Sequence, residues 1–116
     1  MTTGHLPIRS ELEEAVLGLV LRGGLAPPKV NVPLLVHGRL VMPDFRWPEQ
    51  RLVVEADGAT WHESKVARED DAERQALLEL TGERVIRVTW RQVIDQPHQT
   101  LARIVAAGAP LARTWH

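Results

Sequence analysis

The chain has 116 residues, a formal net charge of −1, 44% hydrophobic residues and no cysteine. This length suits one compact domain, and the charge argues against a protein that coats nucleic acid through bulk positive charge. The absence of cysteine excludes a disulfide scaffold and a thiolate metal site. No apolar run reaches the ~18 residues of a membrane span, and the N-terminus lacks the order of a signal peptide, so we expect no membrane partner and a cytoplasmic location.

The first expected elements are one helix and three strands. Ser10 is the expected N-cap of the helix, Glu13 stands at the capping-box position, and Gly23-Gly24 ends the helix. His37-Gly38 is expected to form a turn between strands. The three strands are predicted at residues 30–36, 39–47 and 51–57.

The second half of the chain alternates helices with one strand. A long helix is predicted from residue 64 to 80, and Pro97 fits the first turn of a last helix that ends near Gly108. Between them we expect a strand at 84–89 and a helical turn at 90–94. The order α-β-β-β-α-β-α predicts an α/β fold with a mixed four-stranded sheet flanked by helices.

We expect three regions along the chain. Residues 1–9 form a flexible arm, residues 10–108 a single domain, and residues 109–116 a tail.

Three carboxylates are predicted to share one face of a β-hairpin. If the turn is centred on residues 49–50, Asp44 lies directly opposite Glu55, and Asp57 shares the face of Glu55 because side chains alternate along a strand. Like charges opposite each other on half-buried strands repel unless a cation lies between them. Mg²⁺ suits this arrangement because it takes oxygen ligands and is held by one or two carboxylates plus waters.

Other interpretations of these acidic residues stay open. Asp44 and Asp57 could act as caps at strand ends, and Glu55 could pair with an arginine. Glu13 is either the glutamate of a capping box or a fourth member of the acidic cluster. Three carboxylates on one predicted face favour the cation site.

Two residues just beyond the third strand are candidates for the same site. His62 could transfer a proton near neutral pH, since imidazole titrates there; the alternative is an exposed loop histidine. Trp61 could stack on a base or enter a duplex as a wedge; packing over the sheet edge is the alternative.

Basic residues on the following helix are candidates for contacting a phosphate. A solvated surface with salt bridges is the alternative, with Arg74 paired to Asp70 or Asp71, and Arg74 could instead face the site. The candidate nucleic-acid-binding residues of this helix are Lys65, Arg68 and Arg74.

The ordered set of motifs resembles the core of the PD-(D/E)xK nucleases. It is similar to small bacterial proteins related to very-short-patch-repair endonucleases, from Ser10 to about Ala107. The residues that carry the resemblance are Ser10-x-x-Glu13, Asp44-Phe45, Val54-Glu55-Ala56-Asp57-Gly58 with His62, Asp71-Ala72-Glu73-Arg74, Gly82 and Val85-Ile86-Arg87-Val88-Thr89-Trp90.

The resemblance implies a restriction-endonuclease-like fold and a metal-dependent phosphodiesterase. Carried over, Asp44 and Glu55 hold Mg²⁺, or Mn²⁺ in its place, while Glu13 supports the site and His62 assists proton transfer. Asp57 belongs to the same catalytic set, but it stands where the broader superfamily has a lysine. The residues that could supply the missing positive charge are Lys65, Arg68 and Arg74.

Together, these features predict a metal-dependent DNA endonuclease of the very-short-patch-repair-like type. The alternative is a nuclease-fold module that does not cleave and acts in nucleic-acid binding or protein interaction. A metal-binding structural domain is a third and weaker interpretation. Because the chain is short, a homodimer or a separate targeting partner is a hypothesis for how a target is recognised.

Overall fold

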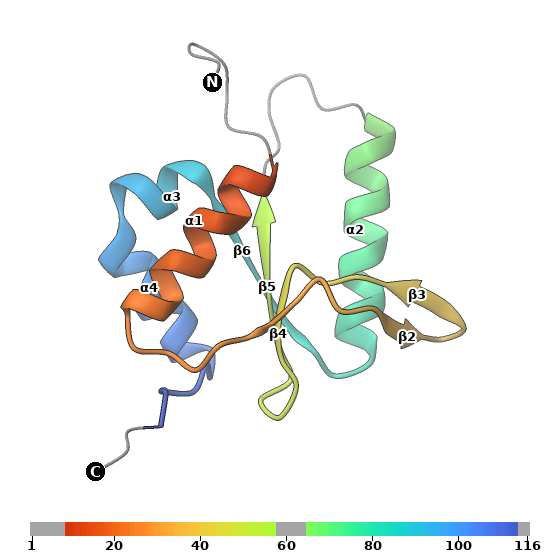
Figure 1. The fold of residues 1–116 in the computed structure, drawn as a ribbon. Coiled ribbons are helices and arrows are strands. Elements are labelled where there is room, and N and C mark those ends of the chain that lie inside the picture. Colours follow the sequence, from red (N-terminus) through yellow and green to blue (C-terminus); the bar gives the residue numbers. More distant parts are fainter. Residues whose placement is uncertain (1–8, 58–64, 114–116) are drawn as a thin grey trace.

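The computed structural model describes residues 9–57 and 65–113, and the side chains within them except at 9–10 and 65–68. A sheet lies between two helical layers (Figure 1). One layer contains three helices and the other contains one. The helices are α1 (Arg9–Arg22), α3 (Trp90–Asp95) and α4 (Pro97–Ala106) on one side, and α2 (Lys65–Leu80) on the other.

The main sheet has four strands in the order β1-β4-β5-β6. The first three pair in antiparallel fashion, and β5 pairs with β6 in parallel, which requires a crossover connection. Helix α2 supplies that crossover. The mixed four-stranded α/β architecture is therefore confirmed. The strands are β1 (Lys29–Val30), β4 (Phe45–Trp47), β5 (Leu52–Asp57) and β6 (Arg84–Thr89).

Two predicted strands are each divided in the structure. The first is interrupted at Asn31, whose φ of 52° is incompatible with an extended strand, and at Pro33, which has no N–H for a ladder. The second is interrupted before Asp44, where Pro43 likewise lacks an N–H. The pieces that leave the main sheet form a separate hairpin of β2 (Leu34–Val36) and β3 (Arg39–Val41).

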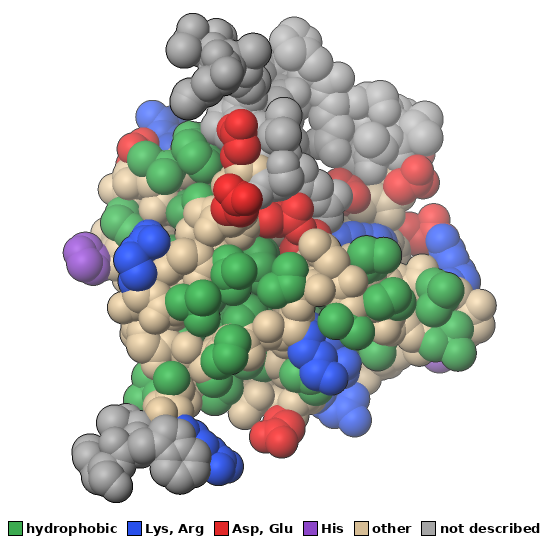
Figure 2. All heavy atoms as spheres, viewed as in Figure 1, with side chains coloured by type: hydrophobic (Ala, Val, Ile, Leu, Met, Phe, Trp, Pro, Cys, Tyr) green, Lys and Arg blue, Asp and Glu red, His purple; other side chains and the backbone are tan. Residues whose placement is uncertain are grey.

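The β2–β3 hairpin is closed by the predicted turn at His37-Gly38. Both residues have positive φ, 48° and 80°, which is the signature of a two-residue type I′ turn. Val36 and Val41 are buried beneath the hairpin, whereas the cross-strand pair Leu35 and Leu40 is exposed. Hydrophobic side chains accordingly lie at the surface near the right edge of Figure 2.

The β4–β5 hairpin has the predicted register. Phe45 is the partner of Val54, and Trp47 is the partner of Leu52, as a turn centred on residues 49–50 requires. The connection is tight, because the N–H of Arg51 donates to the carbonyl of Pro48 at 3.1 Å.

Strand β5 is buried on both faces, and its alternate residues enter different cores. Leu52, Val54 and Ala56 belong to the larger core on the side of α1, α3 and α4. Val53 packs with Leu78 of α2 in the smaller core. Because Glu55 alternates with Val54 and Ala56, it shares the face of Val53 and lies on the α2 side.

The start of α1 differs from the prediction. The described part of α1 starts at Arg9, so the helix already includes Ser10, the predicted N-cap. The side chain of Ser10 lies outside the described residues, and the capping-box interpretation of Glu13 stays a prediction. Gly23-Gly24 follows the last helical residue as expected, with Gly24 at φ 83°.

A partly buried ion pair connects β4 to the residue just before β6. Arg46 Nε and Nη2 donate to the two carboxylate oxygens of Glu83 at 2.8 and 3.0 Å, and the side chain of Glu83 is 1% exposed. The hydrogen bond that Arg46 donates to Glu83 raises the pKa of Arg46 above its ordinary value. This fork-to-fork contact fixes the strand that follows Asp44.

Replacing Glu83 with glutamine is expected to lower the free energy of unfolding by about 3 kcal/mol, because it leaves the Arg46 charge unpaired. Urea unfolding measures the change. Glu73→Gln is the matched control, since the Arg39–Glu73 pair is 60% and 61% exposed, and it should change stability by less than about 1 kcal/mol. Equal effects of the two substitutions would show that burial of the Arg46 pair contributes nothing.

Among the described residues, no helix is both long enough and apolar enough to cross a bilayer.

Candidate active site

Asp44 and Glu55 face each other across the β4–β5 hairpin and are both buried. The N–H of Asp44 donates to Glu55 Oε2, and the N–H of Ala56 donates to Asp44 Oδ2, each at 2.8 Å. Each carboxylate is thus held by the backbone of the opposite strand. This reciprocal arrangement fixes the orientation of both side chains at the point where β4 begins.

Glu55 also contacts a cation, the guanidinium of Arg74. Arg74 Nη1 donates to Glu55 Oε1 at 2.7 Å, and Nη2 donates to the same oxygen. The side chains are 23% and 3% exposed, so this is a partly buried ion pair. The interpretation in which Glu55 pairs with an arginine is confirmed for this residue. Of the two interpretations of Arg74, pairing with Asp70 or Asp71 or facing the site, the structure shows the second, because its partner is a carboxylate of the sheet.

The position of Arg74 follows from the periodicity of α2. Asp71, Arg74 and Leu78 recur at i, i+3 and i+7, which places them on one face of the helix. Leu78 is fully buried against Val53 of β5, so this face is the one turned toward the sheet. Arg74 lies one turn before Leu78 and reaches Glu55, two residues after Val53.

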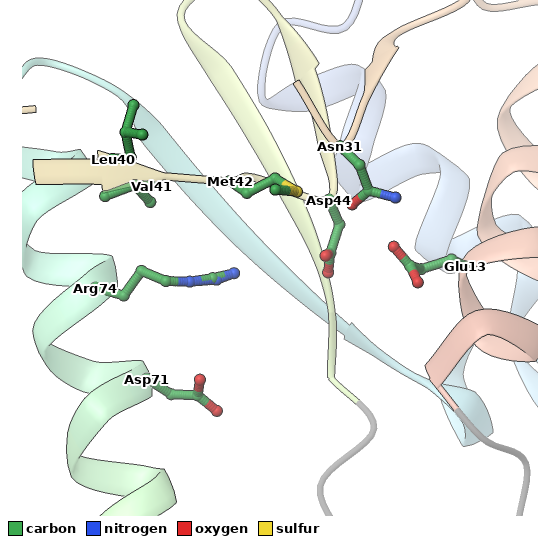
Figure 3. Close-up of a pocket in the computed structure, with 8 residues that line it drawn as sticks. All are labelled: Glu13, Asn31, Leu40, Val41, Met42, Asp44, Asp71 and Arg74. Atoms are coloured by element: carbon green, nitrogen blue, oxygen red, sulfur yellow. The ribbon is translucent and has the colours of Figure 1, made fainter. Parts of the chain in front are cut away.

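An open pocket of about 500 Å³ lies between α1 and α2, at the beginning of β4 (Figure 3). Glu13 enters it from α1, and Arg74 and Asp71 enter from α2, with Asp44 between them. The residues that line the pocket are Glu13, Asn31, Leu40, Val41, Met42, Asp44, Asp71 and Arg74.

Among the charged residues that line the pocket, carboxylates outnumber cations. Its described residues include three carboxylates, from Glu13, Asp44 and Asp71, and one guanidinium, from Arg74. Acidic side chains also gather in the upper half of the face in Figure 2. A site with this charge repels a phosphate unless a further cation is bound there.

The other predicted site residues fall into two groups. Asp57 ends β5, is half-buried and is the strand partner of Thr89; it is not among the described residues that line the pocket. The second group lies outside the described part of the structure. It consists of Trp61 and His62 and of the side chains of Lys65 and Arg68.

The sequence interpretation missed Asp71 and Asn31 as lining residues. The position of Asp71 could have been found from its helical spacing to Leu78. Asn31 gave no such signal, because its approach to the pocket depends on a long-range hydrogen bond from its N–H to the carbonyl of Asp44 at 3.0 Å.

The donor chemistry of the site fits a hard divalent cation. Within the described part of the chain, no group of three or more His, Asp or Glu side chains is placed to hold a metal. Asp44 and Glu55 remain as an oriented pair of carboxylates. Mg²⁺ is commonly held by one or two carboxylates and keeps several waters, so the oxygen atoms of this pair are of the type that it binds.

The mixed four-stranded sheet and its two helical layers are consistent with a restriction-endonuclease-like fold. Residues 30–107 match the model of the restriction-endonuclease-like family REase_MTES_1575, and the chain belongs to this family. Comparison with curated proteins and with solved structures gave no match. The matched range contains Asp44, Glu55 and Arg74, whereas Glu13 precedes it. Membership indicates a nuclease-type domain and hence a nucleic-acid ligand.

Proposed function

We propose that the protein is a metal-dependent DNA endonuclease of the PD-(D/E)xK type, related to the very-short-patch-repair-like enzymes. The observation that carries this proposal is the position of Asp44 and Glu55. They are two buried carboxylates that meet where β4 begins beside β5, and Asp44 also lines the pocket that acidic residues of α1 and α2 enter. Family membership supports the same class of reaction.

In this proposal Asp44 and Glu55 hold Mg²⁺, with Mn²⁺ as a substitute. The backbone hydrogen bonds to both carboxylates keep them oriented before the cation arrives. Bound Mg²⁺ supplies an activated water at neutral pH and positive charge opposite the developing charge on the phosphate. Glu13 supports the site from α1, and Asp57 and His62 complete the proposed catalytic set, with His62 in proton transfer.

The proposed ligand is a DNA backbone in the cytoplasm. Positive charge for its phosphates comes from the helix after the site, and Trp61 contacts a base. A homodimer or a separate targeting partner provides the selection of a target. The proposed phosphate-binding residues are Lys65, Arg68 and Arg74.

A nuclease assay tests the proposal. Wild-type protein is incubated with supercoiled plasmid, linear duplex, single-stranded DNA and RNA, in Mg²⁺, in Mn²⁺ and in a chelator. We expect metal-dependent cleavage of DNA that is lost in Glu55→Gln and retained in Asp95→Asn, a control that removes an exposed carboxylate on α3. Cleavage that persists in Glu55→Gln would contradict the assignment of the site.

A second candidate function is a nuclease-fold module that binds without cleaving. The ion pair between Arg74 and Glu55 favours it, because an internal cation already meets the charge of the buried glutamate. This candidate predicts nucleic-acid or protein binding with no cleavage in either metal. The same assay, with binding measured by fluorescence anisotropy, separates the two functions.

A further inference from the structure

Arg74 stands between two places where negative charge is found or expected. On one side it donates through both terminal nitrogens to a single oxygen of Glu55. On the other side it lines the pocket beside Asp44 and is 23% exposed. A guanidinium has five N–H donors in a planar fork, so contacts with one oxygen leave donors for a second anion.

A divalent cation at Asp44 and Glu55 would change the balance at this ion pair. Glu55 is 3% exposed, and a buried carboxylate requires a compensating positive charge, which Arg74 supplies. A cation held by the same carboxylate takes over that compensation and repels the guanidinium, since like charges within a few ångströms disfavour each other strongly in a partly buried site. The guanidinium then interacts more favourably with an anion in the pocket than with Glu55.

We propose that Arg74 exchanges partners: it neutralises Glu55 before the divalent cation binds and binds a phosphate of the nucleic acid afterwards. This inference rests on the proposed function and specifies how its site takes a phosphate. It has two thermodynamic consequences. Arg74 and the divalent cation compete for Glu55, and cation binding and nucleic-acid binding strengthen each other through Arg74.

The first test measures the competition in the absence of nucleic acid. Mn²⁺ is titrated calorimetrically into wild type, Arg74→Met and Arg39→Met at pH 8, because protonated carboxylates do not bind metal. Arg39 is the matched control, since it makes an exposed ion pair with Glu73 on the same helix. We expect Arg74→Met to bind Mn²⁺ about tenfold more tightly than wild type, within the range typical of coupled sites, and Arg39→Met to be unchanged.

The second test measures the coupling. Anisotropy of a labelled 20-base-pair duplex (a length of about two helical turns) gives its affinity with and without Ca²⁺, an oxygen-liganded cation. In wild type we expect Ca²⁺ to tighten duplex binding about tenfold, in Arg39→Met the same, and in Arg74→Met less than about twofold. Where Arg74→Met does not fold, Arg74→Lys replaces it, and its coupling should fall at least about threefold because a point charge lacks the fork.

The outcomes distinguish this inference from the function on which it rests. Unchanged or weaker Mn²⁺ binding in Arg74→Met, or wild-type coupling in the Arg74 variants, would overturn the exchange even if the wild type cleaves DNA. Wild type that cleaves neither DNA nor RNA would contradict the proposed function. In that case the Mn²⁺ titration alone decides whether Arg74 competes for Glu55.

Discussion

Replacing Asp44 with asparagine is expected to lower the rate of DNA cleavage by more than about 100-fold while the protein stays folded, since residues that merely support metal ligands already contribute 10–100-fold. Asparagine has nearly the same shape, and its side-chain oxygen can still accept the N–H of Ala56 that Asp44 Oδ2 accepts. The substitution therefore removes the charge of the carboxylate and retains the contact between the strands.

Plasmid cleavage in Mg²⁺ measures this effect, and the thermal unfolding midpoint shows whether the fold is intact. Asp95→Asn is the control for loss of one acidic charge, because Asp95 is exposed on α3. A cleavage rate for Asp44→Asn within a factor of about three of wild type would remove Asp44 from the site, since loss of even a supporting group is expected to exceed that factor.

Replacing Arg74 with methionine is expected to lower the free energy of unfolding by about 3 kcal/mol, the lower end of the range for a broken buried pair. Methionine preserves the aliphatic stem of Arg74 near Leu78 but leaves the Glu55 charge without the guanidinium. The lower end applies because Arg74 keeps partial contact with solvent.

A double-mutant cycle separates the ion pair from the packing of the two side chains. Arg74→Met combined with Glu55→Gln should cost about 2 kcal/mol less than the sum of the two single changes, because neither charge then remains. Urea unfolding of the four proteins gives this coupling energy. Additive losses would mean that the ion pair between Arg74 and Glu55 contributes no stability.

The β4–β5 hairpin was the most predictable part of the site. Its two-residue turn centre fixed the register, and the alternation of side chains then placed Asp44 opposite Glu55. These are local rules that need no knowledge of the remaining fold. The type I′ turn at His37-Gly38 was predictable for the same reason.

The strand predictions that were wrong concern features that depend on long-range contacts. The β2–β3 hairpin leaves the main sheet because Val36 and Val41 bury against Leu78 of α2, far along the chain. The breaks that allow this departure were marked by Pro33 and Pro43, but a proline alone does not tell which sheet a strand joins.

The partner of Glu55 likewise could not be predicted from the local sequence pattern. Arg74 carried two plausible partners on its own helix, and only the crossover of α2 onto the sheet brings it to β5. The helical spacing of Asp71, Arg74 and the buried Leu78 was the sequence feature that could have predicted this position.

Calorimetric titration of Mg²⁺ into wild type and Asp44→Asn tests most directly that the opposed carboxylates form a cation site. We expect one Mg²⁺ per chain for the wild type and no measurable binding for Asp44→Asn, with Asp95→Asn equal to wild type. No binding to the wild type, or equal binding to wild type and Asp44→Asn, would contradict the cation site.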